Sequence, residues 1–276
     1  MFEGVSAIAS DLTADLAALR PRPDLGATLW RHPALVLRFY QPAATFALRA
    51  TEGRRRVLDV GSGYGTIALE LARAGHEVTA LDSSEEACTV ARRTLAGVEA
   101  VVVHAAFGAD ELHEGSFDAI RFGRSLHHMD DVGAAAERAA LLLSPGGVVV
   151  IDEFCAERID RATASWLASI TASLTKAGVV PAGAGLTDAD EILRTWTEKR
   201  EKHKLITGEQ MWRALEARFK LDEPAWYPYL WKEPAKHVED AQRAALVAHQ
   251  VEAAEAALIA SDTIPGVAFR TSGTVR

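Results

Sequence analysis

Two adjacent histidines and a glutamate are the residues of this 276-residue sequence that best suit proton transfer. His127 and His128 follow an apolar stretch at 117–122, and Glu153 follows another at 148–151. A histidine has an unperturbed pKa of about 6.5, so it can accept a proton near neutral pH, and a nearby carboxylate orients the imidazole. We therefore predict that His127 or His128 acts as a general base, assisted by Glu153.

Two other roles are open to these side chains. One of the two histidines can brace its loop without touching a substrate, and two histidines with a carboxylate can also bind a metal ion. The acidic residues that follow, Asp130 and Asp131, are expected to cap the next helix, because a carboxylate accepts hydrogen bonds from the first backbone N–H groups of a helix. Proton transfer is the interpretation that we carry forward, and no metal site is predicted.

A glycine-rich turn is the second chemical feature of the sequence. An apolar run at 57–60, typical of a buried strand, leads into the motif D-x-G-x-G-x-G at 59–65, and an amphipathic stretch follows at 67–74. A strand, a glycine turn and a helix in this order bring backbone N–H groups and a helix N-terminus to a ligand. The dinucleotide-binding pattern G-x-G-x-x-G would require glycine at position 66, where this chain has Thr66.

The elements that must position these residues alternate between strand and helix. Apolar stretches expected to form strands lie at 57–60, 78–81, 98–103, 117–122 and 148–151, with helical patterns between them. Near-continuous apolar strands separated by helices indicate a parallel sheet that is covered on both faces. Because ligands bind outside the carboxyl ends of such strands, the histidines and the glutamate are expected to face one crevice.

The segments outside this alternation are expected to add helices and two further strands. A helix is predicted over 5–19, capping boxes at Ser83 with Glu86 and at Thr207 with Gln210, and strands at 225–231 and 267–271, the last antiparallel at the sheet edge. The predicted fold is α/β, a doubly wound, seven-stranded, mostly parallel sheet with a helical cap and insertion. Its parts are an N-terminal helical cap (1–50), a core that carries the glycine turn (51–154), a helical insertion or lid (155–206) and the C-terminal part of the core sheet (207–276).

Aromatic side chains are frequent in the predicted insertion and cap. Trp196 and the segment 226–231 favour an apolar substrate chamber under a lid, although they could equally form the core of the lid or a dimer interface. In the cap, Trp30, Phe39 and Tyr40 either pack on the sheet or close over a ligand.

Composition limits the class of partner. The net charge of −8 and the isoelectric point near 5.6 argue against a nucleic-acid substrate, which usually requires a basic surface. Two cysteines, Cys88 and Cys155, are too few for a disulfide framework or a zinc site. No apolar run is long enough for a membrane span, and the N-terminus lacks a signal-peptide pattern. We expect a cytoplasmic enzyme with a small-molecule substrate, and a homodimer is compatible with the sequence.

Further matches along the chain strengthen a family resemblance. Asp82 ends the second predicted strand, 21 positions after Gly61, and the segments 115–120, 125–130 and 143–147 follow in order. Together with the glycine turn, these segments resemble the class I S-adenosylmethionine-dependent methyltransferases, in particular small-molecule enzymes of the ubiquinone- and sugar-modifying kind. The resemblance implies a Rossmann-like fold, S-adenosyl-L-methionine as the cofactor and S-adenosyl-L-homocysteine as its product.

The resemblance also assigns residues to the cofactor. Asp82 is expected to hydrogen-bond both ribose hydroxyls, because two adjacent hydroxyls match the two oxygens of a carboxylate. The family often holds the adenine amino group with an acid after the third strand, but this chain has none before Asp110, so we expect backbone and apolar contacts from Ala106 and Phe107. The complete predicted cofactor site is Asp59, Gly61, Ser62, Gly63, Tyr64, Gly65, Asp82, Ser83, Ala106, Phe107 and Ser125.

The chemistry implied by the resemblance is methyl transfer. Transfer from a sulfonium ion is an in-line displacement that depends largely on positioning and electrostatics, and it needs a base only where the acceptor must lose a proton. The histidines therefore favour transfer to oxygen of a small molecule, as in specialised metabolism, while carbon and nitrogen acceptors stay open. The alternative is a cyclase or lyase that binds the same cofactor without transferring the methyl group; Thr66 disfavours a nicotinamide-dependent oxidoreductase.

Overall fold

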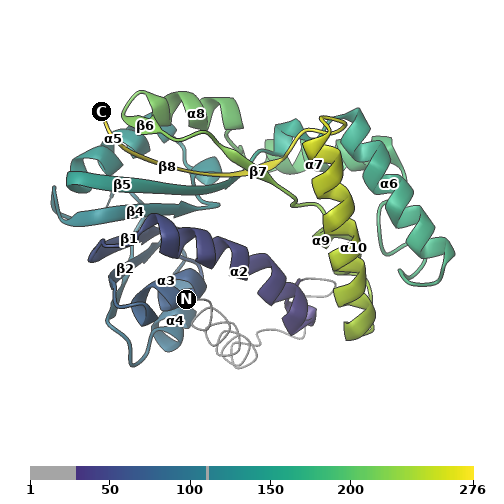
Figure 1. Cartoon of the computed structure of the whole chain (residues 1–276), viewed down its shortest axis with the longest axis horizontal. Helices are drawn as coiled ribbons and strands as arrows, with labels where there is room; N and C mark the ends of the chain where they lie inside the picture. The colour runs from purple at the N-terminus through teal and green to yellow at the C-terminus, as the bar shows by residue number, and fades with distance from the viewer. Residues whose placement is uncertain (1–28, 110–111) are drawn as a thin grey trace.

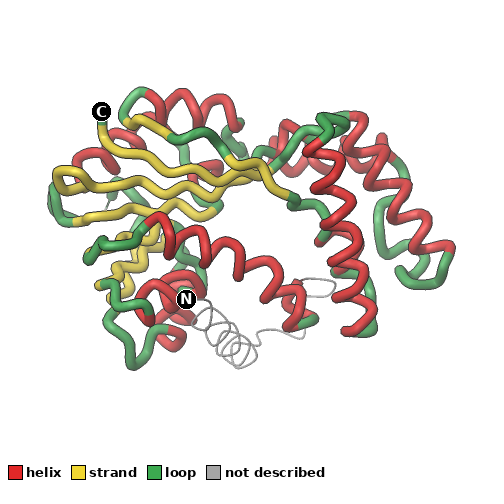
Figure 2. Tube along the Cα trace, viewed as in Figure 1, coloured by secondary structure: helices red, strands yellow, loops and turns green. Residues whose placement is uncertain are grey.

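The computed structural model describes residues 29–109 and 112–276, so the helix predicted over 5–19 and Asp110 lie outside the described residues. Within the described part, a sheet with its covering helices occupies one end of the molecule and a group of helices the other (Figure 1). Figure 2 shows the same division, with the strands gathered on one side. No helix in the described ranges is long and apolar enough to cross a bilayer.

The described elements alternate along the chain up to residue 154, as the apolar pattern predicted. The strands are β1 Arg56–Val60, β2 Glu77–Asp82, β3 Ala100–His104, β4 Phe117–Gly123, β5 Leu143–Phe154, β6 Phe219–Leu221, β7 Ala225–Tyr227 and β8 Ala268–Val275. The helices are η1 Leu29–Arg31, α2 Pro33–Ala50, α3 Thr66–Arg73, α4 Glu85–Thr94, η2 Leu126–His128, α5 Val132–Leu142, η3 Ala156–Arg158, α6 Arg161–Lys176, α7 Ala189–Lys202, α8 Gly208–Glu216, α9 Lys232–Ala235 and α10 Ala241–Ala260.

The sheet has the predicted α/β topology. Its order is β3-β2-β1-β4-β5-β8-β6, with β7 also paired to β8. The first five strands are mutually parallel, whereas β8 runs antiparallel to β5. Because these strands are parallel, the loops after β1, β2 and β4 lie at the same edge of the sheet. The strand order reverses between β1 and β4, and ligands of open α/β sheets bind at such a reversal.

The C-terminal strands differ from the prediction. The sheet has eight strands instead of seven, because residues 219–221 form β6 and only 225–227 of the segment 225–231 form β7. Both strands pair with β8 on the side away from β5, so β8 is not the edge strand. Pro224 separates the two strands and Pro228 ends the second, since proline has no N–H group to donate to a ladder.

Two helix caps can be compared with the prediction. The capping box at Thr207 and Gln210 forms as expected and starts α8. The helix after β2, however, is capped by Ser84, whose Oγ accepts a hydrogen bond from the Ala87 N–H at 3.2 Å. Ser83, the predicted cap, therefore lies one position outside the helix terminus and lines a pocket instead.

Helices cover both faces of the sheet. On one face, apolar residues of α5 and α8 pack against β1, β4 and β5. On the other face, α3 and the C-terminal half of α2 pack against β1 and β2. The two faces follow the alternation of the strand, since Leu58 and Val60 belong to the first cluster and Val57 to the second.

A lid lies beyond the carboxyl end of β5. We use this name for α6, α7, α9 and α10, which share two apolar clusters with the N-terminal half of α2 (Figure 1). The segment 155–206 is helical as predicted. The helices α9 and α10, from the range 207–276, pack against α2 and α6 rather than on the sheet. The alanine-rich α10 shows why: its buried residues, such as Val247 and Val251, meet Leu35 of α2 and Trp231.

The helix α2 joins the sheet to the lid. Its C-terminal residues Ala43, Ala44 and Ala47 are buried against the sheet side, while Leu35 is buried among lid residues. Pro42 lies inside the helix between these two groups, and because proline lacks an N–H it removes the hydrogen bond to the carbonyl of Arg38.

A buried acid connects α10 to the turn after Pro228. The Glu255 carboxylate accepts hydrogen bonds from the backbone N–H groups of Tyr229, Leu230 and Trp231 at 2.8 to 3.0 Å. In the predicted strand 225–231, these three N–H groups would have belonged to the sheet, but β7 ends at Tyr227. Glu255 therefore satisfies backbone donors that the sheet leaves unpaired.

Both cysteines are free and buried. Cys88 lies in α4, with its Sγ 3.4 Å from the backbone oxygen of Asp82. Cys155 follows β5 at the base of the lid, and burial raises the pKa of its thiol.

Candidate active site

The glycine turn after β1 brings three loops into contact. Gly61, Gly63 and Gly65 have φ angles of +69°, +55° and +78°, in the left-handed region that favours glycine. A Cβ on Gly61 would lie 2.4 Å from the Cβ of Ser125, so this glycine also allows the loop after β4 to approach the turn. Ser125 Oγ donates a hydrogen bond to the Val60 carbonyl at 2.9 Å and holds the two loops together.

Asp82 lies at the end of β2 beside this turn. Its Oδ2 accepts a hydrogen bond from the Gly63 N–H and its Oδ1 one from the Ser84 N–H, both at 2.8 Å. Each carboxylate oxygen can accept more than one bond, so both oxygens keep acceptor capacity for a ligand. The backbone thus fixes the carboxylate in place, where it lines a pocket.

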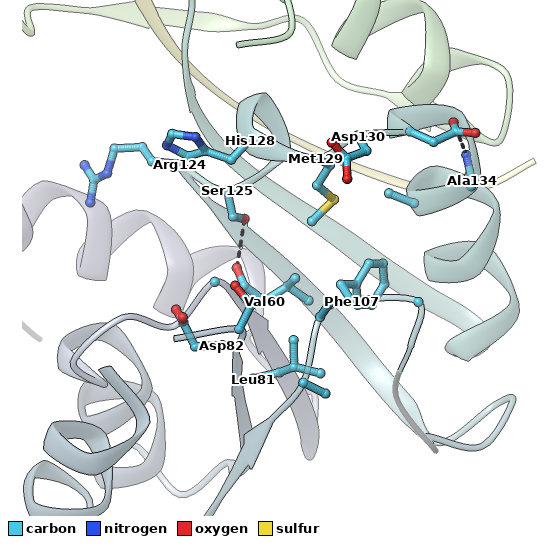
Figure 3. Close-up of a pocket in the computed structure, with 17 residues that line it drawn as sticks. Val60, Leu81, Asp82, Phe107, Arg124, Ser125, His128, Met129, Asp130 and Ala134 are labelled. Atoms are coloured by element: carbon cyan, nitrogen blue, oxygen red, sulfur yellow. Dashed lines mark hydrogen bonds between the residues drawn. The ribbon is translucent and has the colours of Figure 1, made fainter. Parts of the chain in front are cut away.

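The pocket has a volume of about 620 Å³ and opens at the carboxyl edge of the strands. Gly61, Asp82, Ser83, Ala106, Phe107 and Ser125 line it, and all six belong to the predicted cofactor site. Figure 3 shows Phe107 on one side of Ser125, while Arg124 and His128 point to the opposite side. The pocket is therefore long enough to hold groups of different chemistry at its two ends.

Phe107 forms one end of the pocket. Its ring contacts Phe122 edge-to-face, with 5.4 Å between the ring centroids, and it packs against the main apolar cluster. The adjacent loop is held to β2 by the Ala105 N–H, which donates to the Asp82 carbonyl at 3.1 Å. This arrangement presents an apolar surface next to backbone groups, as the prediction for Ala106 and Phe107 requires.

Glu153 and His127 form a buried pair behind the pocket. His127 Nδ1 lies 2.5 Å from Glu153 Oε2, and the histidine is only 7% exposed. Glu153 Oε1 accepts hydrogen bonds from the backbone N–H groups of Ser125 and Leu126 at 2.7 and 2.6 Å. Glu153 and His127 do not line the pocket; the acid holds the loop after β4 and one of its histidines in place.

His128 is the histidine that lines the pocket. Its ring lies against His127, with 4.3 Å between the ring centroids. Partial burial, followed by the proximity of His127, lowers the pKa of His128 below its usual value. The side chain is therefore mostly neutral at pH 7, which is the protonation state that can accept a proton.

The remaining predicted residues lie around the pocket without lining it. Asp59 is fully buried, and its Oδ1 lies 2.6 Å from Nη1 of Arg121, so it faces the neighbouring strand β4 instead of a ligand. The Tyr64 ring lies 6.0 Å from that of Trp30. The other three, which shape the turn, are Ser62, Gly63 and Gly65.

The sequence interpretation did not assign several pocket residues to the site, among them three in the loop after β4. Arg124, Met129 and Asp130 line the pocket, and all three flank the predicted Ser125 and His128 in the loop after β4. Their position directly after a parallel strand was the available signal. Asp131 caps α5 as predicted, through a 2.9 Å hydrogen bond from the Ala134 N–H to its Oδ1, whereas Asp130 lies at the pocket rim.

Comparison with known proteins identifies the family. A family model of a methyltransferase domain matches residues 57–147. A ubiquinone biosynthesis O-methyltransferase from Pectobacterium atrosepticum is 32% identical over 183 residues, which cover 60% of this chain and 70% of that relative. The chain belongs to the class I S-adenosylmethionine-dependent methyltransferases. The cofactor is thus S-adenosylmethionine.

Other similarities cover shorter parts or the fold alone. A ubiquinone biosynthesis O-methyltransferase from Alkalilimnicola ehrlichii is 40% identical over 106 residues, 37% of this chain and 42% of that relative. The chain thus spans about half the length of the curated relatives it matches first. The structure of geranyl diphosphate C-methyltransferase from Streptomyces coelicolor A3(2) has a TM-score of 0.55 at 12% identity, covering 94% of this chain and 83% of that one, which supports the fold.

The pocket residues suit the cofactor of this methyltransferase family. Asp82 offers two fixed carboxylate oxygens to a pair of ribose hydroxyls, and Phe107 offers an apolar surface to an adenine ring. Gly63 has open space where a side chain would stand, so the turn leaves its outer side free. In the described part of the chain, no three His, Cys, Asp or Glu side chains gather in a way that could hold a metal ion.

Proposed function

We propose that this protein transfers a methyl group from S-adenosylmethionine to a small organic acceptor. The observation that carries the proposal is that Asp82, held by two backbone N–H groups, and His128 line one pocket at the carboxyl edge of the sheet. The cofactor, when bound, supplies an electrophilic methyl group. The chain's own residues hold the cofactor at Asp82 and present an imidazole at the other end of the pocket.

We propose further that His128 removes a proton from a hydroxyl of the acceptor. His128 lines the pocket and has a lowered pKa, whereas His127 is buried and bonded to Glu153 through Nδ1. Glu153 therefore acts on the reaction indirectly, by positioning the loop that carries His128. Relatives named ubiquinone biosynthesis O-methyltransferases support transfer to oxygen.

Carbon transfer and transfer-free chemistry are the competing functions. A relative from Clavibacter sepedonicus is named demethylmenaquinone methyltransferase. This name and those of the two ubiquinone biosynthesis O-methyltransferases all specify methyl transfer, which favours transfer over a cyclase or lyase. A role in specialised metabolism, a homodimer, a cytoplasmic location and the absence of a nucleic-acid substrate stay predictions.

Calorimetric titration with S-adenosylhomocysteine tests the cofactor assignment. We expect micromolar affinity in the intact chain and clear weakening in Asp82→Ala. Absence of binding to the intact chain would overturn the proposed function. Transfer itself is tested with isotopically methyl-labelled S-adenosylmethionine and a panel of phenols, catechols and their amino analogues, followed by mass spectrometry. Label in a phenol or catechol ether supports transfer to oxygen, whereas label only on nitrogen or carbon contradicts it.

A further inference from the structure

Arg124 is a partly buried cation for which the described residues provide no directly bonded anionic partner. The Nη1 atom of its guanidinium is buried without a hydrogen bond, and the group makes no ion pair with a described residue. Its Cζ lies 4.2 Å from the ring centroid of Phe39 and 5.6 Å from that of Tyr40, both in α2. Arg124 also lines the pocket, where Figure 3 shows its side chain pointing away from Phe107.

Lys232 is a second basic group on the same aromatic ring. Its Nζ lies 4.9 Å from the ring centroid of Phe39, 3.0 Å from that of Tyr229 and 6.0 Å from that of Phe154. The residue is 9% exposed, and its ammonium makes no hydrogen bond or ion pair with a described residue. Burial lowers the pKa of Lys232 well below its usual value. Two basic groups from separate parts of the chain therefore meet at Phe39.

The buried acids nearby already have other partners. Asp59 pairs with Arg121, and Asp152 accepts a 2.5 Å hydrogen bond from the Tyr227 hydroxyl and lies 3.5 Å from Arg270. Further along, Glu233 pairs with Lys236 at 2.6 Å and Glu255 accepts backbone N–H groups. Buried charges are normally paired, because an unpaired ion loses its hydration without compensation. Burial acts to lower the pKa of Arg124, but the negative charge of Asp152 and smaller contributions from nearby tyrosines together outweigh it, and the net shift is upward. Asp152 nevertheless makes no direct hydrogen bond or ion pair with the Arg124 side chain, so no described carboxylate pairs directly with Arg124.

We propose that Arg124 and Lys232 bind an anionic group, a carboxylate or a phosphate, carried by an apolar methyl acceptor. The planar guanidinium suits the oxygens of either group. The rings of Phe39, Phe154 and Tyr229 would contact the apolar body of the acceptor, and His128 lies in the same pocket as Arg124. This inference rests on the proposed function and adds to it the substrate class, an aromatic or apolar acid.

A carboxylate could also come from the methionine part of the cofactor, so the experiment must separate the two sources. S-Adenosylhomocysteine carries this carboxylate and 5′-methylthioadenosine lacks it. We expect Arg124→Met and Lys232→Met to bind both nucleosides as the wild type does. Loss of affinity for S-adenosylhomocysteine alone in either variant would show that the cation serves the cofactor, and would overturn the proposal for that residue.

The acceptor itself is tested with probes of matched shape on protein saturated with S-adenosylhomocysteine. Benzoate and phenyl phosphate represent the two anionic groups, and benzamide is the neutral control. We expect at least one anion to bind at least tenfold more tightly than benzamide, and Lys232→Met to lose about tenfold of that affinity, as for a charge-assisted hydrogen bond. Lys199→Met is the matched control, because this exposed lysine also lies over a lid ring, 4.4 Å from Trp196, and should change nothing.

Proton uptake provides a second readout. An anion bound beside Lys232 favours the ammonium form, so titration in HEPES and in Tris, which differ in ionisation enthalpy, should reveal uptake of a proton by the wild type and none by Lys232→Met. Equal binding of benzamide and both anions, or unchanged anion affinity in Lys232→Met, would overturn the inference. Binding of S-adenosylhomocysteine in those experiments would show that the proposed function survives.

Discussion

The two adjacent histidines differ in every physical respect that matters for proton transfer. His127 is buried and bonded to Glu153, and its carbonyl accepts a hydrogen bond from the Ile206 N–H at 2.9 Å. His128 lines the pocket and makes no bond to that acid. Their order in the sequence could not separate them, because the 3₁₀ turn η2 decides which ring faces the sheet. One residue in the pair is thus structural, and the other is available to a ligand.

Replacement of each histidine should separate these roles. We expect His128→Gln to lower kcat by about 10²- to 10⁴-fold with little change in cofactor affinity, as for loss of a general base. His127→Gln should mainly lower the unfolding temperature, because Glu153 then loses a buried partner. Steady-state kinetics with the acceptor found in the labelling screen checks both, and near-normal turnover of His128→Gln would remove the general base from the mechanism.

The pH profile of kcat follows from the lowered pKa of His128. The base works only when neutral, so activity should fall as the pH drops through that pKa, with the midpoint of the acid limb below 6.5. The measurement is kcat between about pH 5 and 8, with Asp240→Asn, which alters the cap of α10 away from the pocket, as control. A midpoint of the acid limb above 6.5 would contradict the assignment, and so would an acid limb that persists in His128→Gln.

Asp82 is the residue on which cofactor affinity should depend most. Asp82→Ala is expected to weaken S-adenosylhomocysteine by roughly 1–3 kcal/mol, since ribose hydroxyls would lose their acceptor and Gly63 and Ser84 would lose theirs. Calorimetry measures the change. Cys88→Ala, a nearby buried substitution that leaves the carboxylate intact, is the control, and equal affinities of wild type and Asp82→Ala would exclude the ribose contact.

At the scale of elements, apolar runs predicted the parallel part of the sheet well. The central strands β1 and β4 and residues 149–154 of β5 are buried almost throughout, so their side chains carry a continuous signal, whereas β3 at the sheet edge is only partly buried. The short strands β6 and β7 lack this signal, because two prolines divide an aromatic segment and its last backbone donors turn to Glu255 instead. That acid lies 26 positions from Tyr229, and a local pattern cannot reveal such a pairing.

The burial of the Glu255 carboxyl group should make the stability of the protein depend on pH. Burial outweighs the backbone hydrogen bonds and raises the pKa of Glu255 from 4.5 to about 7. Because the folded protein holds the Glu255 proton more tightly than the unfolded chain, this group contributes about 3 kcal/mol to the free energy of unfolding. The contribution is fully present below pH 4.5 and is lost as the pH rises through 7. Glu255→Gln should lose this part of the pH dependence in urea unfolding. Parallel curves for the two proteins between about pH 4.5 and 8 would contradict the prediction.

At the scale of the whole molecule, α2 joins two packed bodies. Its C-terminal half belongs to the sheet and its N-terminal half to the lid, where Arg38 pairs with Glu252 of α10 (Figure 1). The rings of Phe39 and Tyr40 lie over Arg124, which follows β4. Strands and helices alternate up to residue 154 and helices follow over 156–202, while the division of the chain into a core and an insertion stays a prediction. The meeting of Phe39, Arg124 and Lys232, far apart in the sequence, required the folded chain.

Pro42 should weaken this connection. Pro42→Ala restores the missing backbone bond to Arg38 and is expected to raise the free energy of unfolding by about 1–3 kcal/mol, because proline is unfavourable inside a helix. Urea unfolding measures the gain, and Gln41→Ala, at the adjacent position, should change it by no more than about 0.5 kcal/mol. A destabilised Pro42→Ala would contradict this prediction.

The two buried cysteines supply this protein with a natural pair of chemical reporters. Cys88 lies under the loop that carries Asp82, and Cys155 lies at the base of the lid, so a thiol reagent can reach them only through different opening motions. S-Adenosylhomocysteine should slow modification at Cys88, whereas an acceptor bound under the lid should slow it at Cys155. Peptide mass spectrometry of the unaltered chain can therefore follow both openings separately, without an introduced label.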